Sequence, residues 1–327
     1  MKYWSRYALL AAIAASFVFS FFSDQIDDYV LNVLLMIGIN IILAVSLNLV
    51  NGHTGQFSLG HAGFMAVGAY TSASVTLFAS APLLKLFGGS GPFGNGATFF
   101  IALLAGGLLA AVAGLLVGVP SLRLRGDYLA IVTLGFGEII RVIFQNTDAV
   151  GASRGLGGIP AYTNFFWTFA LAAITIYVIA SLVDSTYGRG FLAVRDDEVA
   201  AEAMGINTTK YKVIAFVLGA FFAGIAGGLY AHYITYITPE GFNFLKSVDV
   251  VVMVILGGMG STLGVTAAAV LLTVLNEFLR EAEEYRMIIF ALLLIIMMIV
   301  RPQGLIGDLA WMRGKKKKPV APNTLKR

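Results

Sequence analysis

The sequence has no cysteine among its 327 residues, so it offers neither a disulfide framework nor a thiolate metal or redox site. Charged residues are scarce: they make up 12% of the chain, whereas soluble domains carry roughly 25%. Hydrophobic residues account for 58%, and the mean hydropathy is +0.84. This balance predicts an all-α polytopic transmembrane helical bundle of about 8–10 spans, including broken or re-entrant segments.

Motifs for local chemistry are also missing. The chain contains no G-x-x-x-x-G-K-[ST] and no H-E-x-x-H, so we expect it to be no enzyme and to bind no ATP. A formal G-x-G-x-x-G at 89–94 lies between apolar spans instead of between a strand and a helix, which excludes a dinucleotide site. His53 and His61 have no Asp, Glu or Cys nearby, so we expect packing or capping roles and no metal site.

One polar segment, Gly188 to Lys212, separates two apolar runs at 167–183 and 213–237. Each run is long enough to cross a hydrocarbon core of about 30 Å as a helix. The polar segment is therefore predicted to be a loop between membrane spans.

Within this loop, Asp196 suits a helix N-cap and Gly205 suits a left-handed position after the helix. These signals predict a helix of about two turns, Asp197 to Met204. Such a short helix is marginal in water and needs a surface to pack against. Its small and acidic side chains suit a partner surface with basic groups, although a solvated loop helix is the alternative.

Two apolar stretches are interrupted. The predicted span at 29–50 breaks at 51–63, and the run at 248–275 is broken at 257–264, which predicts a hairpin. Irregular backbone in a membrane is tolerated only where it is buried in protein or lines a wet cavity, as in transporters with a midplane site. The candidate residues of a translocation path lie at these breaks and on the span at 128–145: Asn48, Gln56, Ser58, His61, Thr133, Glu138, Gly257, Gly258 and Gly260.

Glu138 and Arg141 are three residues apart on one predicted helix, so they can pair. Because an unpaired charge in the bilayer is costly, we expect both to face the interior of the bundle. A structural ion pair and a role in the path are equally open.

Several sequence motifs resemble those of a known protein family. The run RDDEVAAEAMGIN at 195–207, followed by AFVLGAFFAGIAGGLYA at 215–231, closely resembles the LivM-type permease subunit of branched-chain amino acid ABC importers. GQFSLGH at 55–61 and LRGDYLAIVTLGFGEIIR at 124–141 look like the same family. VGASR at 150–154 departs from the family's usual Thr-Gly-Gly, so the role of that external loop stays open.

In that family the loop corresponding to 185–212 couples the permease to the ATP-hydrolysing subunit. The resemblance implies this role here for Arg195, Asp196, Asp197, Glu198, Ala200, Ala201, Glu202, Met204 and Gly205. It also implies a homologous second permease, two ATP-binding cassette subunits that bind ATP and Mg, and an extracytoplasmic solute-binding protein. The implied solute is a branched-chain amino acid, with urea or an amide as the alternative. A carrier driven by an ion gradient through Glu138, or a channel-like subunit, is the alternative mechanism.

Charge predicts the orientation. Basic residues precede the first span, and a basic tail occupies 315–327 after a single permease domain at 1–314. Beside a membrane span, such a tail marks the cytoplasmic side and gives no reason to expect nucleic acid. We therefore expect a multi-pass protein of the bacterial inner membrane whose two termini are cytoplasmic.

Overall fold

A computed structural model of the chain describes residues 2–20, 25–87, 89, 91–121, 126–282, 288–289, 292, 295–296, 299 and 304–305. The basic tail at 315–327 lies outside these residues, as does most of the expected last span at 287–300. Throughout the described part every regular element is a helix, and one isolated antiparallel bridge joins Leu156 to Ile237. The all-α prediction is confirmed.

The helices are joined by connections of varied length, the longest of which, 146–164, lies between α6 and α7. In order they are α1 (Lys2–Ser20), α2 (Asp28–Asn48), α3 (His61–Phe78), α4 (Ser80–Leu86), α5 (Pro92–Ser121), α6 (Asp127–Gln145), α7 (Phe165–Val183), α8 (Gly188–Asp196), α9 (Glu198–Ala203), α10 (Thr208–Ile234), α11 (Phe244–Gly257) and α12 (Thr262–Phe278). Within the described residues, five segments are long and apolar enough to cross a membrane: Asp28–His53, Pro92–Ser121, Tyr128–Gln145, Phe165–Val183 and Thr208–Ile234. Tyr7–Ser20 and Thr262–Phe278 are shorter apolar helices.

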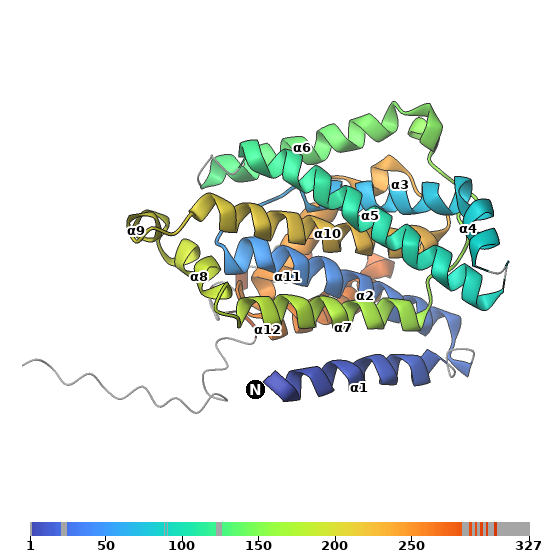
Figure 1. The fold of residues 1–327 in the computed structure, drawn as a ribbon, viewed down its shortest axis with the longest axis horizontal. Helices are drawn as coiled ribbons and strands as arrows, with labels where there is room; N and C mark the ends of the chain where they lie inside the picture. The colour runs from blue at the N-terminus through green and yellow to red at the C-terminus, as the bar shows by residue number, and fades with distance from the viewer. Residues whose placement is uncertain are drawn as a thin grey trace, which may run out of the picture.

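The long helices run side by side along one axis of the molecule (Figure 1). The helix α6 lies on one flank, and α1 packs beside α7 on the other. The short helices α8 and α9 project at one end, where the N-terminus also lies, and α4 lies at the opposite end. The polar segment predicted to be a loop is thus a compact projection from the end of the bundle.

The centre of the bundle is built on close contact between α3, α5 and α10. Gly68, Gly106 and Gly224 meet there, and a Cβ atom added to Gly68 would collide with the backbone of Gly224. Small residues allow backbones to approach in this way, which is how membrane helices gain packing energy without a hydrophobic driving force.

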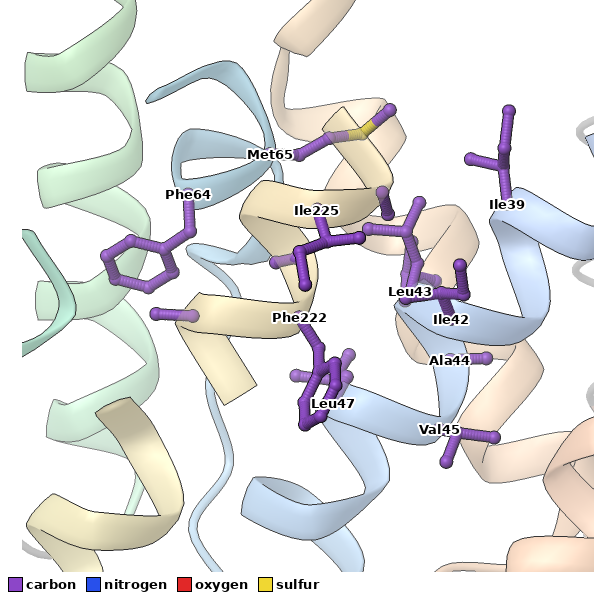
Figure 2. Packing of buried hydrophobic residues seen from close by; sticks show 14 of the residues in the cluster. Ile39, Ile42, Leu43, Ala44, Val45, Leu47, Phe64, Met65, Phe222 and Ile225 are labelled. Atoms are coloured by element: carbon purple, nitrogen blue, oxygen red, sulfur yellow. The ribbon is translucent and has the colours of Figure 1, made fainter. Parts of the chain in front are cut away.

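The helix α2 runs through the core and is buried along most of its length. Figure 2 shows Leu43 and Leu47 of α2 on the side that faces Phe222 and Ile225 of α10, and all four residues belong to one buried cluster. An apolar helix that is buried all round cannot be shifted without disturbing its neighbours. This rigidity matters because α2 ends at the first chain break.

Both predicted breaks are present. After Asn48 the chain forms a π-helical turn, Leu49–His53, and then irregular backbone until α3 begins at His61. The second break separates α11 from α12: Gly258 and Gly260 have positive φ angles of 94° and 88°, and Ser261 caps α12 by accepting from the amide of Gly264. Gly257 packs against Val265, and Gly304 packs against Gly258, so the predicted broken hairpin is confirmed.

Candidate functional site

The loop at 185–212 contains two helices where the sequence predicted one. The helix α9 runs from Glu198 to Ala203, within the predicted range, and Gly205 has the expected left-handed conformation with φ +82°. The predicted N-cap at Asp196 is wrong, because Asp197 caps α9 by accepting from the amide of Ala200 at 3.0 Å. Asp196 instead ends α8, which the sequence did not reveal because its glycines mask a helical pattern.

The acidic side chains of the loop turn back onto the loop itself. The carboxylate of Glu198 lies 2.6 Å from the ammonium of buried Lys212, and that of Glu202 accepts from the hydroxyl of Thr208 at 2.7 Å. Asp196 pairs with Arg195 at 2.9 Å. These internal pairs make charge-based docking on a basic partner less suited to the loop than the sequence suggested.

The outward face of α9 is apolar instead. Val199 and Met204 are 62% and 83% exposed, and Ala200 is exposed beside them, whereas Ala201 is buried beneath the helix. Ala201 therefore supports α9 and does not face a partner. Val199 was not singled out from the sequence, since a lone valine in a polar loop carries no signal by itself.

An aromatic cluster anchors α8 to the start of α10. The ring of buried Phe191 lies edge-on to Tyr211 at 5.5 Å, and the ring of Tyr187 lies 4.7 Å from Tyr211. A Cβ atom on Gly190 would overlap the Tyr211 ring, so α8 lies directly against it. Desolvation, with a smaller effect of Tyr211, raises the pKa of Tyr187 above its ordinary value. The loop is thus a firmly attached unit.

The two chain breaks contact each other. The side-chain oxygen of Asn48, at the end of α2, accepts from the amide of Gly260 at 2.9 Å. Gly52 lies directly against the amide of Gly260, where any side chain would collide. We call this contact, together with the irregular segment 54–60, the junction.

Arg195 of α8 connects the loop to both sides of the junction. A methyl group at Gly55 would lie 3.1 Å from Cγ of Arg195, and one at Gly260 would lie 3.0 Å from its Nη1. The side chain therefore spans from the first break to the second. A displacement of α8 must change at least one of these two contacts.

The other predicted path residues mostly have partners within the junction. Ser58 donates its amide to the side chain of Asn51 at 3.1 Å, and Thr133 accepts from the amide of Leu59 at 3.0 Å. Nε2 of His61 lies 2.9 Å from the hydroxyl of Ser46. His53 likewise lies 3.5 Å from the amide nitrogen of Asn48. Both histidines thus contact polar side chains of α2, and the described residues contain no group of three or more metal-ligating side chains.

Gln56 differs from its neighbours. It is 4% exposed, yet neither its side-chain nitrogen nor its oxygen has a hydrogen-bond partner among the described residues. An unsatisfied buried amide costs about 1–3 kcal/mol. Such a cost at the junction is typical of a group that gains a partner in another state or with a ligand.

Glu138 and Arg141 pair as predicted, with Nε of Arg141 donating to the carboxylate at 2.7 Å. Their side chains remain 34% and 27% exposed on α6, at the flank of this chain. They do not reach the junction, so within one chain the expectation that both face the interior is not met. The interior expected from the sequence would need a second subunit against α6.

The junction lies toward the α8–α9 end of the bundle. The helix α2 has 21 residues from Asp28 to Asn48, and at 1.5 Å per residue it spans roughly 30 Å, about the full hydrocarbon thickness. The first break therefore follows a helix about as long as the hydrocarbon core is thick. No residue of the predicted path lines the cavity of about 490 Å³ at the other end of the bundle.

A serine in the divergent loop at 150–154 also has a motif spacing, G-x-S-x-G at 151–155. Ser153 donates to the carbonyl of Gln145 within two 3-10 turns. The strand-to-helix elbow that exposes a nucleophilic serine is absent from this described loop, so the spacing is coincidental.

Comparison with known proteins agrees with the fold. The family described as "Branched-chain amino acid transport system / permease component" matches residues 29–298. The high-affinity branched-chain amino acid transport system permease protein LivM of Salmonella typhimurium is 39% identical over 246 residues, which cover 64% of this chain and 58% of that protein. LivM of Escherichia coli gives the same identity and coverage. LivH of Salmonella typhimurium is 31% identical over 172 residues, covering 50% and 54%. No solved structure matches the chain.

Proposed function

Because the chain belongs to the family of branched-chain amino acid transport permease components, we propose that it is the membrane-spanning permease subunit of an ATP-binding cassette importer. Its solute would be a branched-chain amino acid. The chain spans 58% of the length of the LivM relatives it matches, so the solute and the partners are part of this proposal.

The partners follow from the same reasoning. A homologous second permease would pair with this chain, one of two ATP-binding cassette subunits would dock on the α8–α9 loop, and a solute-binding protein would deliver the solute from outside. ATP and Mg²⁺ would bind to the cassette subunits, since this chain has no P-loop sequence. The assembly would lie in the bacterial inner membrane with both termini of this chain in the cytoplasm.

The observation that carries the mechanism is the position of Arg195. Its backbone belongs to α8. Its side chain contacts Gly55 in the first chain break and Gly260 in the second. Closure of the cassette subunits on ATP would push α9, and the anchored loop would move as one body. Arg195 would then shift the two breaks relative to each other and open the path to alternate faces.

The experiment is reconstitution of the complex in proteoliposomes, after gentle purification from native membranes. Recovery of a second permease and an ATPase, with ATP-dependent uptake of radiolabelled leucine, is the expected result. Uptake that does not depend on ATP, is lost when the ion gradient is dissipated and falls in Glu138→Gln would instead establish a secondary carrier driven by the ion gradient. If the complex takes up urea and not leucine with ATP, the proposed solute is wrong and the proposed ATP-driven mechanism still holds.

The role of Arg195 is tested in the same vesicles. We expect Arg195→Ala to assemble and hydrolyse ATP while moving less leucine per ATP. Arg189→Ala is the matched control, because Arg189 is an exposed arginine on the same helix. An unchanged ratio of leucine to ATP in Arg195→Ala would refute the proposed link between loop and breaks.

A further inference from the structure

One face of the helix α6 is held by the rest of the bundle. It carries a stripe of residues at spacings of three and four, which share a helix face: Thr133, Gly137, Ile140 and Phe144. The hydroxyl of Thr133 accepts from the amide of Leu59 at 3.0 Å, and the ring of Phe144 stacks on that of Tyr70 in α3 at 4.3 Å. This face is therefore packed against α3 and the irregular segment before it.

The opposite face of α6 is uncovered in the described part of the chain. Its stripe has the same spacings and consists of Tyr128, Ile131, Gly135, Glu138 and Val142. Tyr128, Ile131 and Val142 are exposed. Apart from the neighbouring turns of α6 itself, nothing lies within 4 Å of a Cβ atom built on Gly135. The helix forms one flank of the bundle (Figure 1) and is the least buried of the five described spans.

A charged pair lies in the middle of this uncovered face. Glu138 follows Tyr128 by about 15 Å along the axis of an 18-residue span, which is about half of its length. Nε of Arg141 donates to the carboxylate of Glu138 at 2.7 Å, and both side chains are partly exposed. Ions in a bilayer lose their hydration even when they pair, so they face a protein interior or a water-filled cavity. A water-filled cavity on this flank would also need a second wall.

The adjacent helix α5 has a different exposed surface. Its exposed side chains from 108 to 119 are all aliphatic: Leu108, Leu109, Val112, Leu115, Leu116 and Val119. Lipid tails are as apolar as leucine, so this surface needs no protein to cover it. The face of α6 adds a glycine beside open space and an ion pair. Small and polar residues are those with which membrane helices pack closely on one another, so α6 is suited to another protein helix and α5 to lipid.

We propose that this face of α6 is the surface on which the homologous second permease packs. A helix of that permease would lie along Gly135 and over the pair of Glu138 with Arg141, removing the pair from lipid. The choice of partner rests on the proposed function. It is supported by the similarity of this chain to two different permease proteins of Salmonella typhimurium, LivM and LivH. The need for a protein cover comes from α6 itself.

The first test places a photoreactive residue at matched positions of the two helices. Ile139 of α6 and Leu108 of α5 are both exposed. They lie at similar depths, since each is about the same number of residues from the connection between α5 and α6. With benzoylphenylalanine at Ile139, illumination of the full complex in native membranes should join this chain to the second permease, identified by mass spectrometry. Benzoylphenylalanine at Leu108 should give no such product.

The second test adds bulk at the same two surfaces. Gly135→Leu places a side chain in open space, so the variant should reach the membrane in normal amount and keep its unfolding midpoint. It should nevertheless lose the second permease on purification. Val112→Phe is the matched control, because it adds bulk to the exposed face of α5 at a similar depth, and it should retain the second permease. Normal recovery of the second permease with Gly135→Leu would overturn the proposed packing along Gly135.

The outcomes separate this surface from the proposed function. If the probe at Ile139 reacts only with lipid while the same complex takes up leucine with ATP, the second permease packs elsewhere and the function stands. If the probe is joined to a second permease but no ATPase co-purifies and no ATP-dependent uptake is found, the surface stands and the proposed function fails. A product of two copies of this chain would overturn the choice of a different permease as the partner.

Discussion

Three buried side-chain amides lie at or beside the junction, and they differ in whether they have hydrogen-bond partners. Asn48 bonds Gly260 across the two breaks, and Asn51 bonds Ser58 through both its oxygen and its nitrogen. Gln56, a few residues on, is equally buried and has no such partner in the described structure. A buried amide without partners costs stability, so folding alone gives no reason for a glutamine at this position.

We expect Gln56→Met to raise the thermal unfolding midpoint of the purified protein. Methionine has a similar shape, and the change removes an unsatisfied polar group worth about 1–3 kcal/mol. If Gln56 belongs to the path, ATP-dependent uptake falls although stability rises. Thermal unfolding in detergent, measured beside uptake in vesicles, gives both quantities.

Asn51→Leu is the matched control for Gln56→Met. Its amide is also buried, but both ends are bonded to Ser58, so its removal should lower the unfolding midpoint. A lower midpoint for Gln56→Met would show that its amide is satisfied, and unchanged uptake would remove Gln56 from the path.

At the scale of elements, α8 and α9 form a single rigid projection. The ion pair of buried Lys212 with half-buried Glu198 fixes α9 to the N-terminal part of α10, and the aromatic cluster of Phe191 and Tyr211 fixes α8. A helix of six residues is unstable alone, so these contacts are what keep α9 formed. The exposed apolar tip, Val199 and Met204, is then available for a partner.

We expect Val199→Asp and Met204→Asp each to reduce assembly with the ATPase subunit and to reduce uptake. A charge in an apolar interface core costs binding energy, and each 1.4 kcal/mol lowers affinity about tenfold. Because both side chains are largely exposed, the stability of the isolated chain should change by less than about 0.5 kcal/mol. Co-purification of the ATPase subunit with each variant measures the effect.

Thr186→Asp serves as the control for these two variants, since Thr186 is exposed at the start of the same loop but outside α9. It should assemble normally. Normal assembly of both Val199→Asp and Met204→Asp would show that the tip of α9 does not dock.

At the scale of the whole molecule, the junction and a cavity lie at opposite ends of the bundle. Figure 1 shows α8 and α9 at one end, near the junction, and the cavity lined by Tyr29, Lys246 and Arg280 is at the other end. The buried helices α2 and α10 connect the ends. Closely packed interiors transmit displacement, so movement at the loop can reach the cavity along these two helices.

This arrangement predicts opposite labelling from the two sides of the membrane. Met204→Cys should react with an impermeant maleimide only in inside-out vesicles. Gly241→Cys, in the exposed turn between α10 and α11, should react only in intact cells. If both cysteines react from the same side of the membrane, the proposed topology is wrong. If Met204→Cys reacts only in intact cells and Gly241→Cys only in inside-out vesicles, the chain has the opposite orientation.

Much of this protein follows from local sequence. Hydrophobic length predicts the helices, because a bilayer leaves the backbone few other choices. Glycine and polar residues predict both chain breaks, and Gly205 predicts the end of α9, because these depend on the conformations of a few consecutive residues.

Only the tertiary structure decided which of these features meet. Asn48 and Gly260 are 212 positions apart, and Asn40 and Thr273 are 233 apart, so no local pattern could pair them. The inward turn of Glu198 depends on the ammonium of buried Lys212 lying beside it. The position of Arg195 between the two breaks depends on three segments at once. Local rules give the elements, but contact between distant side chains depends on how the whole bundle packs, and that packing creates both the junction and the cavity.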